Sequence, residues 1–482
     1  MKHSFDRYAA YTDLTELKDY SARPLRKSLR ANLLKCSPEG LRAWGTAKGW
    51  QMEPVPWCTE GFFVDREDRT EALGKDLLHM LGYTYMQEAS SMLPVVLLDP
   101  QPGETILDMS SAPGSKTTQI ASRMRGKGVI IANDVQEKRI WGLLSNLLRS
   151  GTTNVVVTKK VGQWFGGHMT EMFDRVLCDA PCTAEGTTRK DSDALRYTSD
   201  DNIGKMSKLQ RELLESAVHA CKVGGRIVYS TCTLTPEENE QVIASVLNTY
   251  SDQLSILDPG LKSEFDFSNA INDSKRVQPL VGIDNPFPAV RVWPQTYNTE
   301  GFFVCVLEKH APTKHRQERD QELHHFTELP RARVAETAKL ASDWYGTSFI
   351  HEGEVLIENK ENELCLIAKE VLELGLPTKS YYAGMPFGKV PRTNIFRISH
   401  EAAVLRGRSA SSHVMEVTEL EFQTLLSGGN LASRGLTEEE GGDILLRVLS
   451  PAFQQPIVVG RGILKGSSVL NRMPRDMVRM FT

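Results

Sequence analysis

Between residues 105 and 307, short apolar runs alternate with segments of helical hydrophobic period, and this alternation restricts the possible folds more than any other feature. Strands are predicted at residues 105–108, 129–134, 154–158, 173–179, 226–230 and 301–307, and helices at 117–124, 137–148, 209–221 and 237–247. Strands that are separated by helices pair in parallel, and helices cover both faces of their sheet. The sequence therefore predicts an α/β fold with a mostly parallel, doubly wound sheet.

Segments of a different character extend the chain on both sides of this region. The 482 residues suggest several domains, at roughly 150 residues each. We expect an N-terminal region at residues 1–95, the α/β domain at 96–311, a connecting α+β domain at 312–400 and a last compact domain at 401–482. A turn rich in proline and glycine lies near the first boundary, and a charged linker is predicted at 311–322. Residues 83–98 have the small and apolar composition of a helix packed on a sheet.

The overall composition is that of an ordinary globular protein. Hydrophobic residues make up 40% of the chain and charged residues 24%. No apolar run approaches the roughly 20 residues that span a bilayer, and the first residues lack the apolar core of a signal peptide. Eight cysteines without regular spacing, and without a CxxC pair, argue against a disulfide framework and a zinc site. We expect a cytoplasmic protein with reduced thiols, no membrane segment and no metal ion.

Positive charge is concentrated in two segments, although the net charge is −4. Residues 24–35 contain the four cations Arg26, Lys27, Arg30 and Lys35, and residues 461–482 contain the five cations Arg461, Lys465, Arg472, Arg475 and Arg479. Each segment is either a solvated surface or a patch that contacts the phosphates of a nucleic acid. The tryptophans that follow the first segment are core residues or surfaces on which bases stack; they are Trp44, Trp50 and Trp57.

A loop of small residues joins the first strand of the α/β region to its helix. Asp108 ends the strand, residues 109–116 form the loop, and the next strand ends in Asp134. Small side chains let a ligand approach the backbone at a helix N-terminus, and an acid after the second strand is suited to bind ribose hydroxyls. The loop matches neither GxxxxGK[ST] nor GxGxxG. The pattern favours an adenosine-type cofactor over a purely structural loop.

Two cysteines follow buried strands of the predicted sheet. Cys182 ends the sequence Asp179-Ala180-Pro181-Cys182, and Cys232 lies directly after the strand at 226–230 and one threonine. A lone cysteine in such a position is usually a small core residue. Two of them at neighbouring strand ends, with a carboxylate, are less easily explained by packing, because ligands bind at the carboxyl ends of strands.

Two thiols and a carboxylate near an adenosine cofactor are suited to methylate carbon 5 of a pyrimidine. That carbon is a poor nucleophile in cytosine, but a thiolate that adds to carbon 6 makes it enamine-like. A carboxylate at the N3/N4 edge of the base would stabilise the adduct. The residues alone do not decide which of the two cysteines is the nucleophile.

These residues resemble the signature motifs of the RNA 5-methylcytosine methyltransferases of the Nol1/Nop2/Sun family. The resemblance lies in residues 24–35, 87–91, 108–118, 179–182, 189–191, 230–234 and 300–303, is densest from 87 to 307, and extends over nearly the whole chain. Residues 112–116 and the long C-terminal part most resemble the members that act on bacterial 16S rRNA. The resemblance implies a class I methyltransferase domain with a Rossmann-like, seven-stranded sheet, S-adenosylmethionine as cofactor, an N-terminal RNA-binding region and a PUA-like C-terminal domain.

The resemblance also implies a role for individual residues. Cys232 would be the nucleophile, Cys182 would assist product release, and Asp179 would lie beside the methyl donor and the base. The cofactor-binding residues would be Ser111, Ala112, Pro113, Gly114, Ser115, Lys116, Thr117, Asp134, Val161 and Asp179. The substrate would be a cytosine in the decoding region of 16S rRNA in the 30S subunit, flipped out of its helix. We expect the protein to act as a monomer.

Three positions depart from the family pattern. Val161 stands where the family has an acid near the adenine, Thr183-Ala184 replaces the usual Ser-Gly, and Ser192 replaces a proline.

Two alternatives remain open. Cys182 is the nucleophile in one of them, as in the Pro-Cys of DNA cytosine methyltransferases. In the other, the protein is a noncatalytic ribosome-assembly factor; Val161 favours this reading, whereas the two thiols and two acids argue against it.

Overall fold

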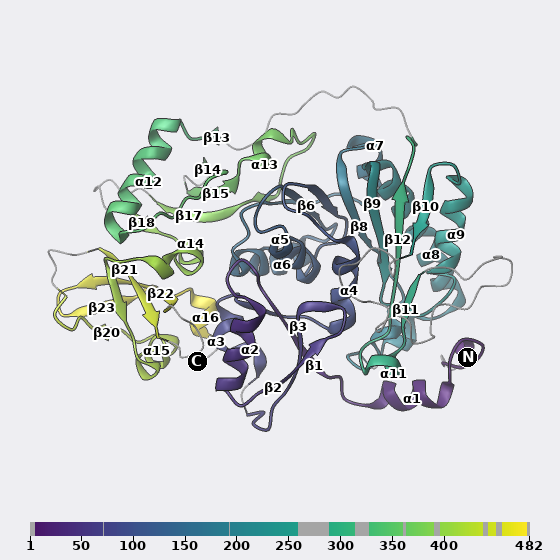
Figure 1. The fold of residues 1–482 in the computed structure, drawn as a ribbon, viewed down its shortest axis with the longest axis horizontal. Helices are drawn as coiled ribbons and strands as arrows, with labels where there is room; N and C mark the ends of the chain where they lie inside the picture. Colours follow the sequence, from purple (N-terminus) through teal and green to yellow (C-terminus); the bar gives the residue numbers. More distant parts are fainter. Residues whose placement is uncertain are drawn as a thin grey trace.

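A computed structural model describes residues 5–70, 72–191, 193–258, 289–313, 327–359, 363–389, 396–436, 442–449 and 456–479. Ser192 and most of the predicted linker at 311–322 lie outside these ranges. The described strands form four sheets, and the largest of them lies at the centre of the chain's α/β region (Figure 1). No helix within the described ranges is long and apolar enough to cross a membrane.

The central sheet has the parallel core that the alternation of strands and helices predicts. Its parallel strands are β5 (Thr105–Asp108), β6 (Val129–Asn133), β7 (Val155–Thr158), β8 (Phe173–Asp179) and β9 (Cys221–Thr231). The antiparallel strands β10 (Leu254–Leu257) and β12 (Phe302–Lys309) complete the order β10-β12-β9-β8-β5-β6-β7. The expected seven strands are therefore present. The short strands β11 (Val290–Val292) and β16 (Tyr382–Ala383) pair with β12 and β7 and extend the sheet to nine.

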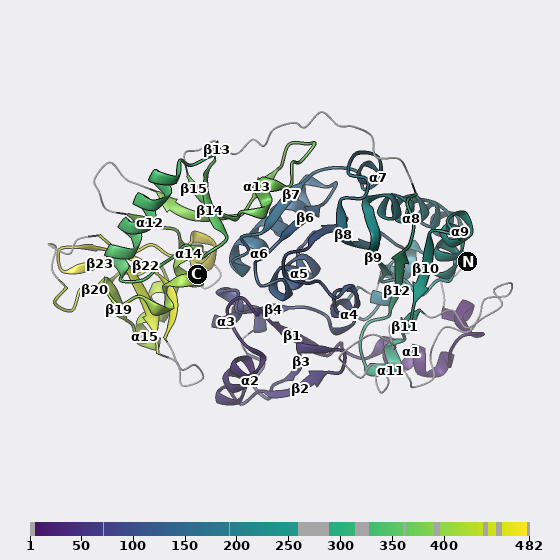
Figure 2. The same cartoon turned by 45° about the horizontal axis from the view of Figure 1, so that its top comes forward.

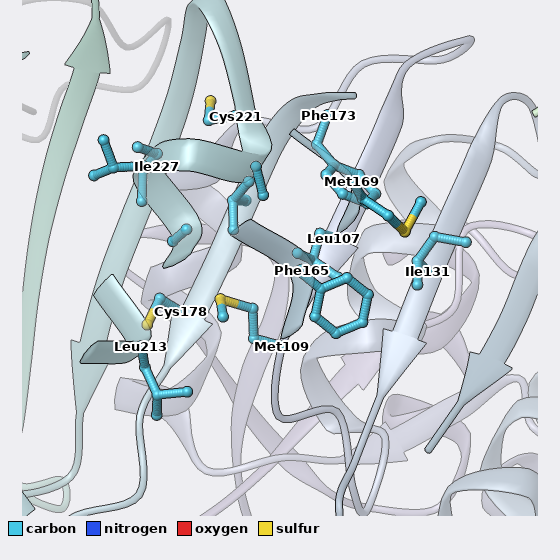
Figure 3. Packing of buried hydrophobic residues seen from close by; sticks show 14 of the residues in the cluster. Leu107, Met109, Ile131, Phe165, Met169, Phe173, Cys178, Leu213, Cys221 and Ile227 are labelled. Carbon is cyan, nitrogen blue, oxygen red and sulfur yellow. The ribbon is translucent and has the colours of Figure 1, made fainter. Parts of the chain in front are cut away.

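Two layers of helices bury the two faces of this sheet. Alternate strand residues point to opposite faces, so Ile131 and Cys178 pack with one layer and Ile130 and Leu177 with the other. The first layer contains α7 (Gln163–His168), α8 (Asp200–Ala220) and α9 (Glu240–Thr249), and part of its core is shown in Figure 3. The second contains α4 (Ala89–Leu98), α5 (Ser115–Arg123) and α6 (Glu137–Ser150). Cys178 is buried on the face opposite Asp179, as the alternation predicts.

The predicted element boundaries hold closely except in four places. Strand β9 begins five residues before the predicted start. Helix α8 begins nine residues before the predicted start, because the Ser199 hydroxyl caps it by accepting from the Asn202 amide at 3.3 Å and the first turn is acidic. Helix α9 begins three residues later than predicted. The helix predicted for 83–98 is wrong in its first part, where β4 (Thr84–Met86) pairs with β1 (Lys27–Ala31) and the helix α4 begins only at Ala89.

The N-terminal part forms a second sheet that packs below α4 and α5 in Figure 2. After η1 (Phe5–Tyr8) and α1 (Leu14–Ala22), its strands are β1 (Lys27–Ala31), β2 (Gln51–Val55), β3 (Cys58–Asp65) and β4 in the order β2-β3-β1-β4, with α2 (Pro38–Ala47) and α3 (Leu77–Met80) beside them. Side chains of β3 share one apolar core with α4 and the central sheet. Trp44 and Trp57 are buried, and Trp57 donates from Nε1 to the Ala89 carbonyl at 2.8 Å, so both are core residues; Trp50 is half-buried.

The first basic segment divides into an outer and an inner half. Lys27 is exposed, and Arg26 pairs with Glu53 on the surface. Arg30 is only 1% exposed and donates to Gln87 Oε1 at 2.7 Å and Thr118 Oγ1 at 2.9 Å. Lys35 is buried as well and donates to two backbone carbonyls. The expectation that Arg30 and Lys35 belong to an open basic surface is therefore wrong, because both bind protein groups in the interior.

The C-terminal part contains two further sheets. The first has the order β13-β14-β15-β17-β18 and consists of β13 (Thr327–Glu328), β14 (Glu354–Glu358), β15 (Leu364–Ala368), β17 (Met385–Lys389) and β18 (Arg397–Ile398), with α12 (Arg331–Tyr345) and α13 (Glu370–Glu373). The second has the order β19-β21-β22-β23-β20 and consists of β19 (Val414–Glu416), β20 (Leu431–Ala432), β21 (Asp443–Val448), β22 (Ile457–Lys465) and β23 (Ser468–Asn471), with α15 (Glu419–Leu426) and α16 (Arg475–Arg479). Helix α14 (His400–Arg406) contributes Ala402 and Ala403 to a core that both sheets share.

Candidate active site

The two cysteines lie together at the carboxyl ends of neighbouring parallel strands. Asp179 at the end of β8 is in register with Ser230 of β9, so the loops that follow these strands start side by side. Cys182 comes three residues after β8, and Cys232 directly follows β9. Their Sγ atoms are 3.3 Å apart. The sheet thus brings together the two thiols that the sequence singled out.

The two thiols also differ from the other six cysteines in exposure. Cys182 and Cys232 are half-buried, whereas Cys36, Cys58, Cys178, Cys221, Cys305 and Cys365 are buried. The hydrogen bond with the Cys232 sulfur, together with burial, raises the pKa of Cys182 well above its ordinary value. Cys182 therefore keeps its proton near neutral pH and can donate it toward the Cys232 sulfur.

Asp179 connects the cysteine loops to the small-residue loop. Its Oδ1 accepts from the Ser230 hydroxyl at 2.7 Å, and its Oδ2 accepts from Lys116 Nζ at 2.7 Å. Burial by itself would lower the pKa of Lys116, but the Asp179 carboxylate outweighs this effect and the pKa is raised. The Lys116 ammonium also lies 5.3 Å from the ring centroid of Phe302. A fixed ion pair therefore stands between the small-residue loop and the thiols.

The small-residue loop lies at the amino end of α5. Thr117 Oγ1 donates to Asp108 Oδ2 at 2.7 Å, and burial raises the pKa of Asp108 to about 6. The Ala112-Pro113 bond is cis. Gly114 has a φ of +110°, and a Cβ there would lie 3.1 Å from Leu143 Cδ1. Gly114 is the N-cap of α5 and makes no side-chain capping bond, so no side chain of the cap closes the helix end.

Asp134 lies directly behind this loop. It follows β6, is 2% exposed, and accepts from the backbone amides of Ala112 at 3.3 Å and Gln136 at 2.9 Å. Arg139 of α6 forms an ion pair with it at 3.2 Å. Asp134 is thus placed beside the residues 111–117, as the sequence pattern predicts.

Val161 is an expected cofactor-binding residue with an apolar side chain. It lies in the loop after β7, which the Asn133 side chain fastens to β6 by donating to the Lys160 carbonyl at 2.9 Å. Its side chain is 56% exposed. The strand end is therefore at the correct edge of the sheet, but Val161 brings no carboxylate there.

Sequence reasoning missed several polar residues around the two cysteine loops. Ser230 was not identified as the partner of Asp179, and Glu185 and Glu238 were not singled out, although both are buried next to the cysteine loops. The only signal was their spacing, because Glu185 comes three residues after Cys182 and Glu238 six after Cys232. Within the described ranges, no group of three His, Cys, Asp or Glu side chains is arranged to hold a metal ion.

Known families match both the central and the N-terminal sheet. Residues 95–308 match the family described as 16S rRNA methyltransferase RsmB/F. Residues 6–89 match the N-terminal domain of 16S rRNA methyltransferase RsmF. Among solved structures, a methyltransferase homolog protein from Pyrococcus horikoshii is 34% identical, with a TM-score of 0.52 over 64% of this chain and 92% of that one. NSun6 from the same organism, with SFG, has a TM-score of 0.54 at 23% identity, and covers 64% of this chain and 98% of its own; it shares the fold.

Curated relatives extend over almost the full length of the chain. The ribosomal RNA small subunit methyltransferase F of Vibrio cholerae is 34% identical over 97% of this chain and 95% of its own. The enzyme of the same name from Aeromonas hydrophila is 33% identical over 99% of this chain and 96% of its own. With this identity over both chains, and with the match of the central sheet to the family's own domain, the protein belongs to the RsmB/F family of 16S rRNA methyltransferases.

Proposed function

We propose that this protein transfers a methyl group from S-adenosylmethionine to carbon 5 of a cytosine in 16S rRNA. The observation that carries the proposal is the 3.3 Å contact between the sulfurs of Cys182 and Cys232, beside Asp179. Membership of the RsmB/F family supports RNA of the small subunit as the substrate. The two juxtaposed thiols are half-buried and not joined by a disulfide, so both are available for chemistry.

The small-residue loop fits an adenosine cofactor with a carboxylate of its own. Gly114 gives the loop a backbone conformation that side chains avoid, and the amino end of α5 is suited to receive a carboxylate. Asp134 supplies a carboxylate for the ribose. The residues that would hold the cofactor are Ser111, Ala112, Pro113, Gly114, Ser115, Lys116, Thr117, Asp134 and Asp179, with Val161 as an apolar neighbour of the adenine. The cofactor supplies an electrophilic methyl group, which carbon 5 of the activated base accepts.

Cys232 is the proposed nucleophile. Its thiolate adds to carbon 6 of the cytosine, and the electron pair of the carbon 5–carbon 6 double bond shifts to carbon 5. Asp179, fixed by Lys116 and Ser230, stabilises the adduct at the N3/N4 edge. After carbon 5 has taken the methyl group, its proton passes to a solvent water, the double bond is restored, and the Cys232 sulfur leaves as a thiolate. Cys182 lies beside that sulfur, where its hydrogen bond with Cys232 and burial raise its pKa, and it assists the release.

The RNA backbone is proposed to lie in a cleft beside the N-terminal sheet. The cleft has a volume of about 1050 Å³ and is lined by the six cations Arg26, Lys27, Arg66, Arg69, Arg189 and Lys190 against three acids. Arg189 donates to the backbone carbonyls of Pro24 at 2.6 Å and Thr299 at 3.0 Å, which joins the N-terminal segment to the loop before β12. A cleft with more cations than acids, which includes Arg189 and Lys190 from the segment after Cys182, is suited to hold phosphates while one base enters the site.

The remaining parts of the proposal concern the whole molecule. Residues 1–95 and 401–482 are proposed to bind RNA, the last as a PUA-like domain, with 96–311 as the catalytic domain and 312–400 as the connection. We further propose that the protein acts as a cytoplasmic monomer on the 30S subunit.

Methyl transfer to defined RNA tests this function. The protein is incubated with methyl-labelled S-adenosylmethionine and either 30S subunits or naked 16S rRNA, and the RNA is then digested to nucleosides. Label in 5-methylcytidine, absent with Cys232→Ala, is the expected result. Label in another nucleoside would refute the chemistry, and no label in either RNA would favour a noncatalytic assembly factor.

A further inference from the structure

Two buried carboxyl groups lie between the loops that carry the thiols. Glu185 belongs to η3 (Glu185–Thr187), just after Cys182, and Glu238 belongs to the turn before α9. Their exposed fractions are 1% and 0%. Within the part of the chain that the structure describes, neither makes an ion pair. Two carboxyl groups without a cation are costly in the interior unless hydrogen bonds and protons compensate.

Glu185 has the environment of an ionised carboxylate. Its Oε1 accepts from the Tyr8 hydroxyl at 2.6 Å, from the amides of Leu234 at 2.8 Å and Thr235 at 3.1 Å, and from the Thr233 hydroxyl. All of these groups are donors. Three of them belong to the segment that follows Cys232, so Glu185 ties the Cys182 loop to the Cys232 loop.

Glu238 and Glu185 share one hydroxyl neighbour, that of Thr183, although Glu238 Oε1 also accepts from the Thr235 hydroxyl at 3.0 Å. Glu238 Oε2 accepts from the Thr183 amide at 3.1 Å and from Gln210 Nε2 at 2.7 Å. Its Oε1 is in hydrogen-bond contact with the Thr183 hydroxyl, which also lies 2.7 Å from Glu185 Oε2. A hydroxyl has only one proton to donate. If Thr183 donates to Glu185, its contact with Glu238 is a hydrogen bond only when Glu238 carries a proton and donates it.

The surrounding charges agree with this assignment. Burial raises the pKa of Glu238, and the negative charge of Glu185 raises it further. The other titratable groups that face the pair are Tyr8, Cys182, Tyr229 and the buried Arg291–Glu240 ion pair, whose guanidinium donates to the Leu234 carbonyl at 2.6 Å. None of these groups places a cation against Glu238.

We propose that Glu185 and Glu238 are positioning residues that share one proton, and that this proton fixes the Cys182 loop against the Cys232 loop at the spacing needed for release. Thr183 is next to Cys182, and Thr233 is next to Cys232, so the network lies one residue behind each thiol. Ionisation of Glu238 would set two carboxylates against one hydroxyl proton, and their repulsion would separate the loops. The inference rests on the proposed function of the two cysteines.

Glutamine substitutions separate the two carboxyl groups. Glu238→Gln keeps a donor toward Thr183 and an acceptor for Gln210, so single-turnover methyl transfer at pH 7.5 should stay within about threefold of wild type, since the network remains satisfied. In Glu185→Gln the side-chain amide directs its protons toward groups that are themselves hydrogen-bond donors. This should misplace the thiols and lower the rate of methyl transfer about 100-fold. The affinity for S-adenosylmethionine should be unchanged. As the pH rises, wild type should lose activity earlier than Glu238→Gln, in which other groups such as the Cys182 thiol are left to lose a proton. Equal effects of both substitutions, or the same alkaline loss in Glu238→Gln, would overturn the proposal.

A measurement without turnover keeps this test independent of the proposed function. Infrared difference spectra between pH 7.5 and alkaline pH are recorded in the Glu300→Gln background, because Glu300 also titrates near 7. They should show a protonated carboxyl band that disappears when Glu238→Gln is added. The matched control is Glu237→Gln on the same turn, because Glu237 is partly exposed and pairs with Arg7 at 2.8 Å; it should leave the band and the pH profile unchanged. A band that survives the addition of Glu238→Gln in this background would refute the shared proton. Absence of methyl transfer by the wild-type protein would refute the proposed function instead.

Discussion

Arg30→Met should lower the free energy of local unfolding of the N-terminal sheet by about 3 kcal/mol. It should leave direct contacts with RNA unchanged. Arg30 makes two short hydrogen bonds inside the protein, to Gln87 Oε1 at 2.7 Å and Thr118 Oγ1 at 2.9 Å. Burial lowers the pKa of Arg30 to about 10, so it remains charged near neutral pH. A hydrogen bond from a charged donor contributes roughly 1.5–3 kcal/mol. The two hydrogen bonds together therefore contribute roughly 3–6 kcal/mol. Because methionine refills part of the volume of the arginine side chain, we take the lower end of this range.

Native-state hydrogen exchange on peptides that cover β1 and β4 measures this cost directly. Arg26→Met is the matched control, because Arg26 lies four residues away and pairs with Glu53 at the surface; it should change local stability by less than about 1 kcal/mol. The double variant Arg26→Met/Lys27→Met, however, should reduce the slope of log K for binding of 16S rRNA against log salt concentration by about 1.5. Unchanged protection in Arg30→Met, together with a reduced salt slope, would refute the burial argument and return Arg30 to the RNA surface.

Two further variants test the electrostatics. Glu300 is 6% exposed and burial raises its pKa to about 7, so its ionisation destabilises the folded protein as the pH rises from about 4.5 to above 7. Glu300→Gln should therefore raise the melting temperature at pH 8 and lose this gain toward pH 4.5, which fluorimetry across this range would measure; an equal gain at both ends would contradict the assignment. Arg472→Ala combined with Arg475→Ala should weaken binding of 16S rRNA and lower its salt slope by about 1.5, whereas an unchanged salt titration would identify a merely solvated surface.

The central sheet and the three groups at its edge were predictable because their signals are local. Each strand is a short apolar run, and Asp179, Cys182 and Cys232 stand where such runs end. Parallel pairing then brings strand ends together without further information. The 3.3 Å approach of the two sulfurs follows from the register of Asp179 with Ser230, which only the structure provides.

The features that the sequence did not reveal depend on contacts between distant segments. Residues 84–86 have a composition that also suits a helix, but pairing with β1 makes them a strand. The strand β16 joins the central sheet from a part of the chain more than 200 residues away. Arg30 looks the same in sequence as an exposed cation, and it is buried because Gln87 and Thr118 meet it from other elements.

The carboxyl pair behind the thiols was missed for the same reason. Glu185 and Glu238 are single acids in polar stretches, where an exposed position is the ordinary expectation. Their burial depends on Tyr8, more than 170 residues away, and on Gln210 of α8. Val161 shows the opposite case, because its departure from the family pattern was evident in sequence and the structure adds only that the side chain is exposed.

The division of labour between the two thiols is the central claim, and trapping of a covalent protein–RNA adduct tests it most directly. Cys182→Ala and Cys232→Ala proteins are each incubated with 30S subunits and S-adenosylmethionine, denatured, and examined for RNA that stays attached to protein. We predict that Cys182→Ala accumulates a denaturation-resistant adduct because release fails, and that Cys232→Ala forms neither adduct nor product. An adduct that accumulates in Cys232→Ala and is absent in Cys182→Ala would make Cys182 the nucleophile and contradict the account.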